Sequence, residues 1–342
     1  MNQTATDLTQ VSFDPELSPG AYNAVNTCLR IQPSEKVTLI TDDDTREIAA
    51  SLVKELTAVG SPFHAYVLED IAPRPLTGLP AEIAEDMETS QVSIFAVRVQ
   101  RNELKSRMEM TDIVNRRRMR HAHMVNINRQ IMMEGMRADF NHVDALSRKV
   151  MDIVTKADKI VARNPAGTDL TADMNRDYKW IKTSGIISRD KWGNLPGGET
   201  FTSPLEVNGT FVVDGVVGDY LCAKYGDLRE TPLTLVVSGN RLVEAHSENK
   251  ELQEEFWNYT HRDENSDRVG EFAIGTNLAC TRVVGNILQD EKIPGVHMAF
   301  GDPYGAHTGA AWSSTTHIDV VGRDFDIWAD DRQIMRSGRF LV

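Results

Sequence analysis

Apolar residues in the first half of the chain follow two alternating patterns. Short apolar runs of strand length occur at residues 36–42, 63–69, 92–99, 123–128 and 159–164. Runs with helical spacing separate several of them, and the first of these helical runs ends at Gly60. Strands that alternate with helices are typical of a parallel sheet covered on both faces. The pattern therefore predicts a Rossmann-like α/β domain over residues 1–164.

The pattern changes after about Asn164. Gly, Asn, Asp and Pro punctuate short β-rich runs, and the turn "SGNR" between two alternating runs indicates a hairpin. Helical spacing occurs only at 249–261 and, more weakly, at 282–290. The second half therefore reads as a β-rich, mostly antiparallel α+β domain over residues 165–342.

Composition narrows the classes of function. The chain has 342 residues, enough for two domains, and its apolar fraction of 41% is that of a globular protein. A net charge of −13 argues against a nucleic-acid partner. The basic run at 115–124 either contacts an anion or forms a solvated helix face. No glycine-rich phosphate motif follows the first strand, so we expect no nucleotide cofactor.

The cysteines and the N-terminal segment bear on the compartment. Cys28, Cys222 and Cys280 lie far apart, which excludes a cysteine-built zinc site and suits a reducing compartment. The first residues have neither a basic start nor an apolar core, and no apolar run is long enough to cross a bilayer. We therefore expect a cytoplasmic protein with no membrane partner.

Candidate metal ligands gather near the C-terminus, in residues 295–319. In a strand, side chains two positions apart point to the same face, so His317 and Asp319 of "THIDVV" emerge together. An imidazole beside a carboxylate suits Zn²⁺, Mn²⁺ or Fe²⁺. A lone His-x-Asp is nevertheless more often a hydrogen-bonded surface pair.

Four further residues are candidates with ordinary structural explanations. Glu199 lies in a Pro-Gly-Gly turn, and Glu271 begins an apolar strand, where an inward carboxylate is costly without a cation. His297 and Tyr304 belong to "HMAFGDPY". Taken singly, Glu199 is explained as a turn carboxylate, Glu271 as an exposed strand end and Tyr304 as a core phenol.

The order of these motifs resembles the thermophilic aminopeptidase family of metallopeptidases, the aminopeptidase T and aminopeptidase S group. The motifs are "GTDLT", "NLPGGETFTSP", "VGEFAIGTN", "HMAFGDPY" and "HID". The resemblance implies a homodimer of two-domain chains whose sites face an enclosed chamber. It also implies two divalent ions (Zn, Co or Mn) bound by six ligands, namely Glu199, Glu271, His297, Tyr304, His317 and Asp319.

A second, more distant resemblance is to the 2,5-dihydroxypyridine dioxygenases, which look like the same scaffold. They hold one non-haem Fe(II) with a histidine at the position of Glu271, and they keep the terminal His-x-Asp. The glutamate at 271 in this chain, together with His297 and Tyr304, favours the two-metal arrangement. A shared scaffold does not by itself determine the chemistry.

Three classes of function follow. The first is an aminopeptidase that hydrolyses small peptides or amino-acid amides through a metal-activated water. In that reaction Glu199 and Glu271 are the acids available to carry a proton, and Tyr304 either binds metal or donates to the oxyanion. The second is an iron-dependent ring-cleaving dioxygenase, and the third is a former enzyme that acts as a binding protein. His307 is left over, either on a loop or near substrate.

Overall fold

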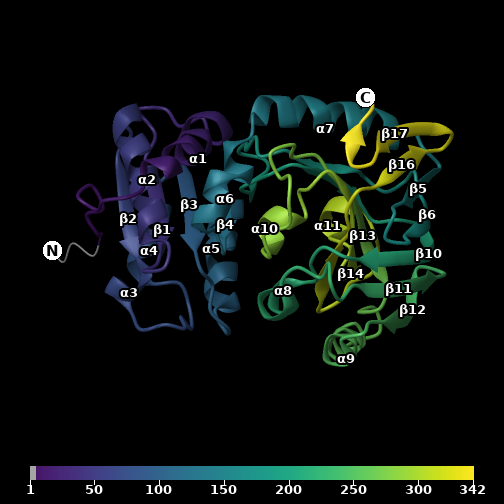
Figure 1. Cartoon of the computed structure of the whole chain (residues 1–342). Coiled ribbons are helices and arrows are strands. Elements are labelled where there is room, and N and C mark those ends of the chain that lie inside the picture. Colours follow the sequence, from purple (N-terminus) through teal and green to yellow (C-terminus); the bar gives the residue numbers. More distant parts are fainter. Residues whose placement is uncertain (1–4) are drawn as a thin grey trace. The chain divides into compact units, whose positions relative to one another are not determined.

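The computed structural model describes residues 5–342, which belong to two compact units (Figure 1). The first unit comprises Met1–Asn141 and Gly185–Gly197, and the second comprises His142–Ser184 and Gly198–Val342. The sequence pattern predicted a single division at residue 164. The chain instead passes from one unit to the other three times, so each unit is built from two segments.

The first unit contains a parallel five-stranded sheet in the order β2-β1-β3-β4-β8. All residues of β1 and β3 are buried, which requires cover on both faces and confirms the α/β prediction. The strands are β1 (Val37–Thr41), β2 (Phe63–Val67), β3 (Val92–Val97), β4 (Arg120–Val125) and β8 (Gly193–Asn194). The helices are α1 (Ser18–Tyr22), α2 (Arg46–Val59), α3 (Leu68–Ile71), α4 (Ala81–Met87), α5 (Leu104–Arg117) and α6 (Arg129–Met133).

Two sequence features of the first unit, the helix end at Gly60 and the basic run at 115–124, can be compared with the structure. Helix α2 ends at Gly60, whose φ of 77° is the left-handed conformation that closes a helix. The basic run at 115–124 is a solvated helix face only over residues 115–117, because α5 ends at Arg117 and β4 begins at Arg120. Its arginines pair with acids of the same unit: Arg116 with Glu88, Arg118 with Asp190 and Arg120 with Glu35.

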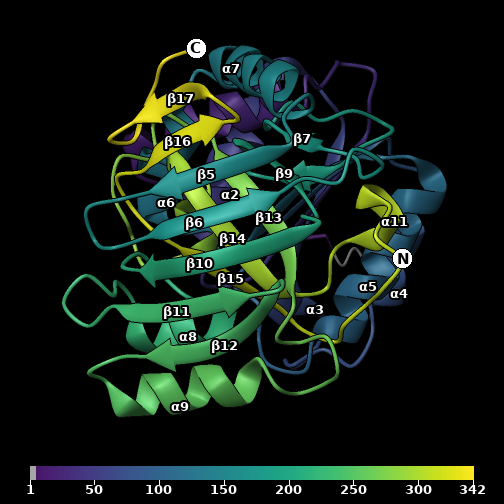
Figure 2. The same ribbon diagram turned by 90° about the vertical axis from the view of Figure 1, so that its right-hand side faces the viewer.

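The second unit is a sandwich of two antiparallel sheets that share one apolar core (Figure 2). The larger sheet has the order β12-β11-β10-β6-β5-β16-β17-β18. Its strands are β5 (Lys159–Arg163), β6 (Asp169–Asp173), β10 (Glu206–Val213), β11 (Leu233–Ser238), β12 (Arg241–His246), β16 (Asp326–Ala329), β17 (Arg332–Arg336) and β18 (Arg339–Phe340).

The smaller sheet of the second unit has the order β15-β14-β13-β9-β7. Its strands are β7 (Ile181–Thr183), β9 (Glu199–Thr202), β13 (Val269–Gly275), β14 (Gly295–Gly301) and β15 (His317–Val321). The helices of this unit are α7 (Phe140–Val154), which begins at the boundary, α8 (Asp219–Tyr225), α9 (Lys250–Tyr259), α10 (Ile287–Asp290) and α11 (Gly305–Thr308). No helix in residues 5–342 has the length and apolar character needed to cross a membrane.

The placement of residues 142–164 differs from the prediction. Strand β5 was expected in the parallel sheet, but it pairs antiparallel with β6 and with the C-terminal β16. The apolar side chains of α7 and β5 join the core of the second unit, including Leu146, Val150 and Ile160. A helix followed by a strand looks the same in either unit, so local periodicity did not distinguish them.

The helix and hairpin predictions for the second half can be compared directly. The "SGNR" turn joins β11 to β12, as predicted. Helix α9 lies within the predicted segment 249–261 and begins after Asn249, whose side chain accepts from the Leu252 N–H. The segment 282–290 is helical only over α10, its last four residues.

Candidate metal centre

Five of the six predicted ligands lie on one face of the smaller sheet, because alternate residues of a strand share a face. Glu199 comes from β9, Glu271 from β13, His297 from β14, and His317 and Asp319 from β15. The register places Asp319 opposite Ala299, and Ala299 opposite Glu271. The intervening residues point the other way and build the core: Phe272, Ile274, Met298, Phe300, Ile318 and Val320.

Small residues lie between the candidate ligands on this face. Ala273 lies between His297 and Phe201 in the register, and Ala299 lies between Glu271 and Asp319. Side chains of one or no carbon leave space above the sheet, where larger ones would fill it. The pattern of small residues between polar ones therefore suits a bound ion on this face.

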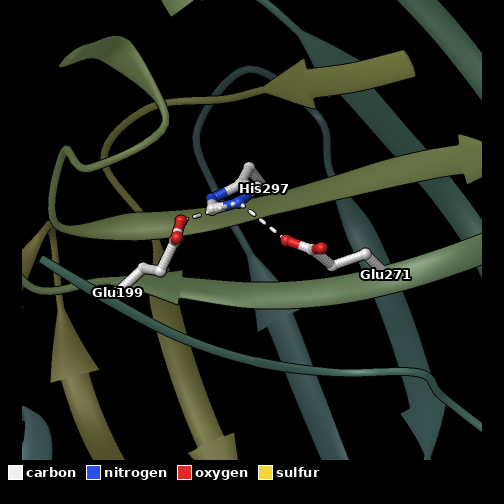
Figure 3. Close-up of side chains that lie close together, drawn as sticks. All are labelled: Glu199, Glu271 and His297. Carbon is white, nitrogen blue, oxygen red and sulfur yellow. Dashed lines mark ion pairs between the residues drawn. The ribbon is translucent and has the colours of Figure 1, made fainter. Parts of the chain in front are cut away.

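The imidazoles and carboxylates converge (Figure 3). The Nε2 atom of His297 lies 3.5 Å from Oε2 of Glu199 and 3.4 Å from Oε1 of Glu271. The Nε2 atom of His317 lies 3.8 Å from Oε2 of Glu271 and 3.4 Å from Oδ1 of Asp319. Glu271 thus has one oxygen towards each imidazole and connects the two halves of the cluster.

Neighbouring groups orient these side chains. The Thr183 hydroxyl donates to Oε1 of Glu199 at 2.6 Å. The Nδ1 atom of His317 lies 2.9 Å from the carbonyl oxygen of Asp302, and a hydrogen bond from Nδ1–H leaves Nε2 with its lone pair free. Support of this kind for a histidine is typical of metal ligands.

Tyr304 lies beside the cluster. Its ring centroid is 4.5 Å from that of His317 and 6.1 Å from that of Phe201. Burial, followed by the charges of Glu271 and Asp319, raises the pKa of the phenol above its ordinary value. The exposed fraction of the whole Tyr304 residue is nevertheless 42% in the single chain, so Tyr304 lies at the solvent side of the site.

Two residues that the sequence reasoning missed complete the cluster. Glu291 and Lys292 follow α10, and the Lys292 ammonium pairs with both Glu291 and Glu199, lying 2.7 Å from Oε2 of Glu199. Lys292 is 1% exposed. In the sequence they stand in "QDEKIPGVH", with Lys292 two residues before the strand that carries His297, and nothing in that local pattern marks a contact with Glu199.

A close backbone approach brings Lys292 to this place. Gly275 at the end of β13 pairs with Glu199, and the chain at Lys292 and Ile293 passes directly over it. A Cβ atom at position 275 would lie 2.0 Å from the Ile293 carbonyl oxygen and 2.9 Å from the Lys292 carbonyl carbon. Only glycine permits this approach.

Negative charge exceeds positive charge in the cluster. Four carboxylates, those of Glu199, Glu271, Glu291 and Asp319, accompany one ammonium group. Burial lowers the pKa of His317, but the charges of Asp319 and Glu271 outweigh it and raise the pKa to about 10. Burial raises the pKa of Glu291 to about 8, although Lys292 acts in the opposite direction. The His317 shift expresses a shortage of positive charge around the imidazole, whereas the Glu291 shift comes mainly from burial.

A divalent ion fits this shortage. The buried Nε2 of His297 has no hydrogen-bond partner of good geometry, although two carboxylates lie near it, and such an orphaned nitrogen needs a ligand. Three groups offer ligand atoms within 4.8 Å of one another: Glu199–Glu271–His297, Glu271–His317–Asp319 and Glu291–His297–Asp319. Imidazole and carboxylate donors suit zinc, cobalt or manganese. The first two groups share Glu271.

His307, the remaining histidine of the stretch, is exposed on α11. It belongs to none of the ligand groups found among residues 5–342. The segment between Tyr304 and His317 contains this short helix.

Comparison with known proteins places the chain among metal-dependent peptidases. The family model described as thermophilic metalloprotease (M29) matches residues 123–340. A comparison with curated proteins finds no match. The wild-type AmpT structure from Thermus thermophilus is similar over 97% of this chain and 100% of that chain, with 16% identity and a TM-score of 0.70.

The 2,5-dihydroxypyridine dioxygenase from Pseudomonas putida KT2440 has a similar structure as well. It matches over 98% of both chains, with 14% identity and a TM-score of 0.68. At such low identity these two likenesses establish the fold alone.

Proposed function

The chain belongs to the thermophilic metalloprotease family M29, and from this premise we propose that it is a metal-dependent aminopeptidase acting on small peptides and amino-acid amides. Membership makes the protein a hydrolase that requires a divalent metal. The finer proposal is that Glu199, Glu271, His297, Tyr304, His317 and Asp319 bind two ions of zinc, cobalt or manganese. The observation that supports it most is the orphaned, buried Nε2 of His297 between two carboxylates.

When bound, the metal lowers the pKa of a water molecule towards neutrality and polarises the scissile carbonyl. The chain's own residues supply the rest. His317, held by the Asp302 carbonyl, keeps Nε2 directed at the ligand cluster. The phenol of Tyr304, partly exposed beside it, either binds metal as the sixth ligand or donates a hydrogen bond to the carbonyl oxygen of the entering substrate.

Specificity for an N-terminus is expected from the metal that these residues would hold. Such an ion would accept the nitrogen lone pair of a free α-amine, whereas the nitrogen of an acetylated amine has no available lone pair. We therefore expect turnover of aminoacyl anilides and short peptides by enzyme loaded with zinc, cobalt or manganese. Acetylation of the amine is expected to abolish it. Equal turnover of free and acetylated substrates would refute the aminopeptidase assignment.

Two histidines of the same stretch offer a matched pair of variants. His317→Ala removes a proposed ligand, so metal content and turnover are both expected to fall. His307→Ala changes an exposed residue of α11 and is expected to leave both unchanged. Turnover of a dihydroxypyridine that depends on oxygen and Fe(II) would instead support the dioxygenase class. The homodimer and the cytoplasmic location stay predictions.

A further inference from the structure

We propose that Lys292 is a built-in competitor for the second metal ion, so that the cluster binds one ion tightly at Glu271–His317–Asp319 and another only weakly beside Glu199. The inference rests on the metal-dependent function proposed above and concerns the order and strength of binding. The two halves of the cluster would then bind metal with unequal affinity, because the Lys292 ammonium pairs with Glu199, the carboxylate that the second ion needs.

The contacts of Glu199 carry the first step. Its Oε2 atom, which lies 3.5 Å from Nε2 of His297, also lies 2.7 Å from the Lys292 ammonium. Its Oε1 atom accepts a hydrogen bond from the Thr183 hydroxyl. Both oxygens of this carboxylate therefore have partners within the chain, and the oxygen nearest His297 already faces a positive charge.

In the part of the chain that the structure describes, no lysine or arginine forms an ion pair with the carboxylates in the other half of the cluster. Within residues 5–342, the ion pairs of Glu271 are with the imidazoles of His297 and His317. Asp319 likewise pairs with His317. An imidazole that gives up its proton becomes a metal ligand itself, so an ion at Glu271, His317 and Asp319 would have no lysine ammonium to displace.

Lys292 is held where it is. Its side chain is buried between Glu199 and Glu291, and its carbonyl oxygen accepts from the Asn277 N–H at 3.1 Å. The close approach over Gly275 leaves its backbone little freedom. Moving a buried ammonium away from two carboxylates is costly, and a divalent ion beside a retained ammonium meets strong repulsion. Either course weakens the second site.

The test is to count metal ions in wild-type protein and in the Lys292→Met variant. Methionine is an unbranched side chain one atom shorter than lysine, and it removes the charge. Equilibrium dialysis against buffered Mn²⁺, with metal counted by plasma mass spectrometry, gives both affinities. For wild type we expect one tight ion and one weak ion. In the variant we expect the second affinity to rise roughly 10- to 100-fold, the usual effect of a group that contacts a ligand.

The matched control is Lys36→Met in the first unit. Lys36 also pairs with a buried carboxylate, that of Asp86, at 2.6 Å, but it lies outside the ligand cluster. Both metal affinities are expected to stay unchanged in this variant. Two equally tight ions in wild type, or no gain in Lys292→Met, would overturn the proposal.

A measurement on unsubstituted protein keeps the proposal testable if Lys292→Met fails to fold. With one equivalent of Mn²⁺, electron paramagnetic resonance is expected to show an isolated bound ion. With two equivalents it is expected to show the same isolated ion together with unbound Mn²⁺. A spin-coupled pair at two equivalents would refute unequal binding. These readings do not involve peptide cleavage, so failure of the aminopeptidase assay would leave them standing.

Discussion

Glu271→Gln is the sharpest single change that the geometry offers. Glu271 directs one oxygen to each imidazole of the cluster, so both ligand groups that share it lose a charged donor. Glutamine has the same shape and removes one negative charge. We therefore expect the variant to fold while its affinity for metal falls at least about 100-fold, beyond the usual effect of groups that only support ligands.

The size of the effect follows from linkage between binding and unfolding. Metal at 100 times its dissociation constant stabilises the native state by about 2.7 kcal/mol. For a unit of 150–250 residues, each kcal/mol raises Tm by about 2–4 °C, so wild type gains roughly 5–11 °C. At the same metal concentration, a 100-fold weaker site stabilises by only about 0.4 kcal/mol. The gain for Glu271→Gln is then about 1–2 °C.

Scanning calorimetry with excess chelator and then with Mn²⁺ or Zn²⁺ measures this difference. The matched control is Glu244→Gln on β12, where an exposed glutamate pairs with His246 at 2.8 Å. This control is expected to keep the full wild-type gain in Tm. An equal gain in Tm for Glu271→Gln and wild type would refute the assignment of Glu271 as a ligand.

Two further predictions concern the floor of the site and the stability of its unit. Ala299→Leu fills the space between Glu271 and Asp319, so metal affinity is expected to fall at least about tenfold by equilibrium dialysis, whereas Met298→Leu on the core face keeps it. Burial raises the pKa of Asp144, but hydrogen bonds from Lys182 and Ser184 outweigh it and lower the pKa to about 2. Because this folded-state pKa is depressed, its stabilisation is present above about pH 4 and is lost as pH falls towards 2. Asp144→Asn is then expected to lose about 1–2 kcal/mol of unfolding free energy at pH 7, after allowance for solvent screening. Urea titrations of variant and wild type measure this loss. The two proteins are expected to differ at pH 7 and to have nearly the same unfolding free energy at about pH 2.

The placement of the candidate ligands on strands was predictable because strand geometry is local. The spacing of His317 and Asp319 places them on one face wherever the strand lies, and the cost of burying Glu271 pointed to a cation. The fold class followed from periodicity in the same way. That these strands bring Glu199 and His297 to the same face depended on the resemblance to known metallopeptidases, since periodicity does not reveal which strands are neighbours.

The features that were missed depend on long-range pairing. Strand β5 follows a helix, as in an α/β unit, but its partner β16 lies more than 150 positions later. Lys292 reaches Glu199 only because the chain passes over Gly275, a contact that no local pattern encodes. A buried lysine beside a metal ligand is also rare, because it costs free energy unless carboxylates surround it.

Anomalous diffraction at the zinc or manganese edge, from crystals grown with that metal, tests the central claim most directly. The account predicts a strong peak at roughly 2.0–2.2 Å from Nε2 of His317 and from the carboxylates of Glu271 and Asp319. A weaker second peak beside Glu199 and His297 agrees with competition by Lys292. A metal-loaded crystal with no peak among these residues, or with its strongest peak elsewhere, would contradict the account.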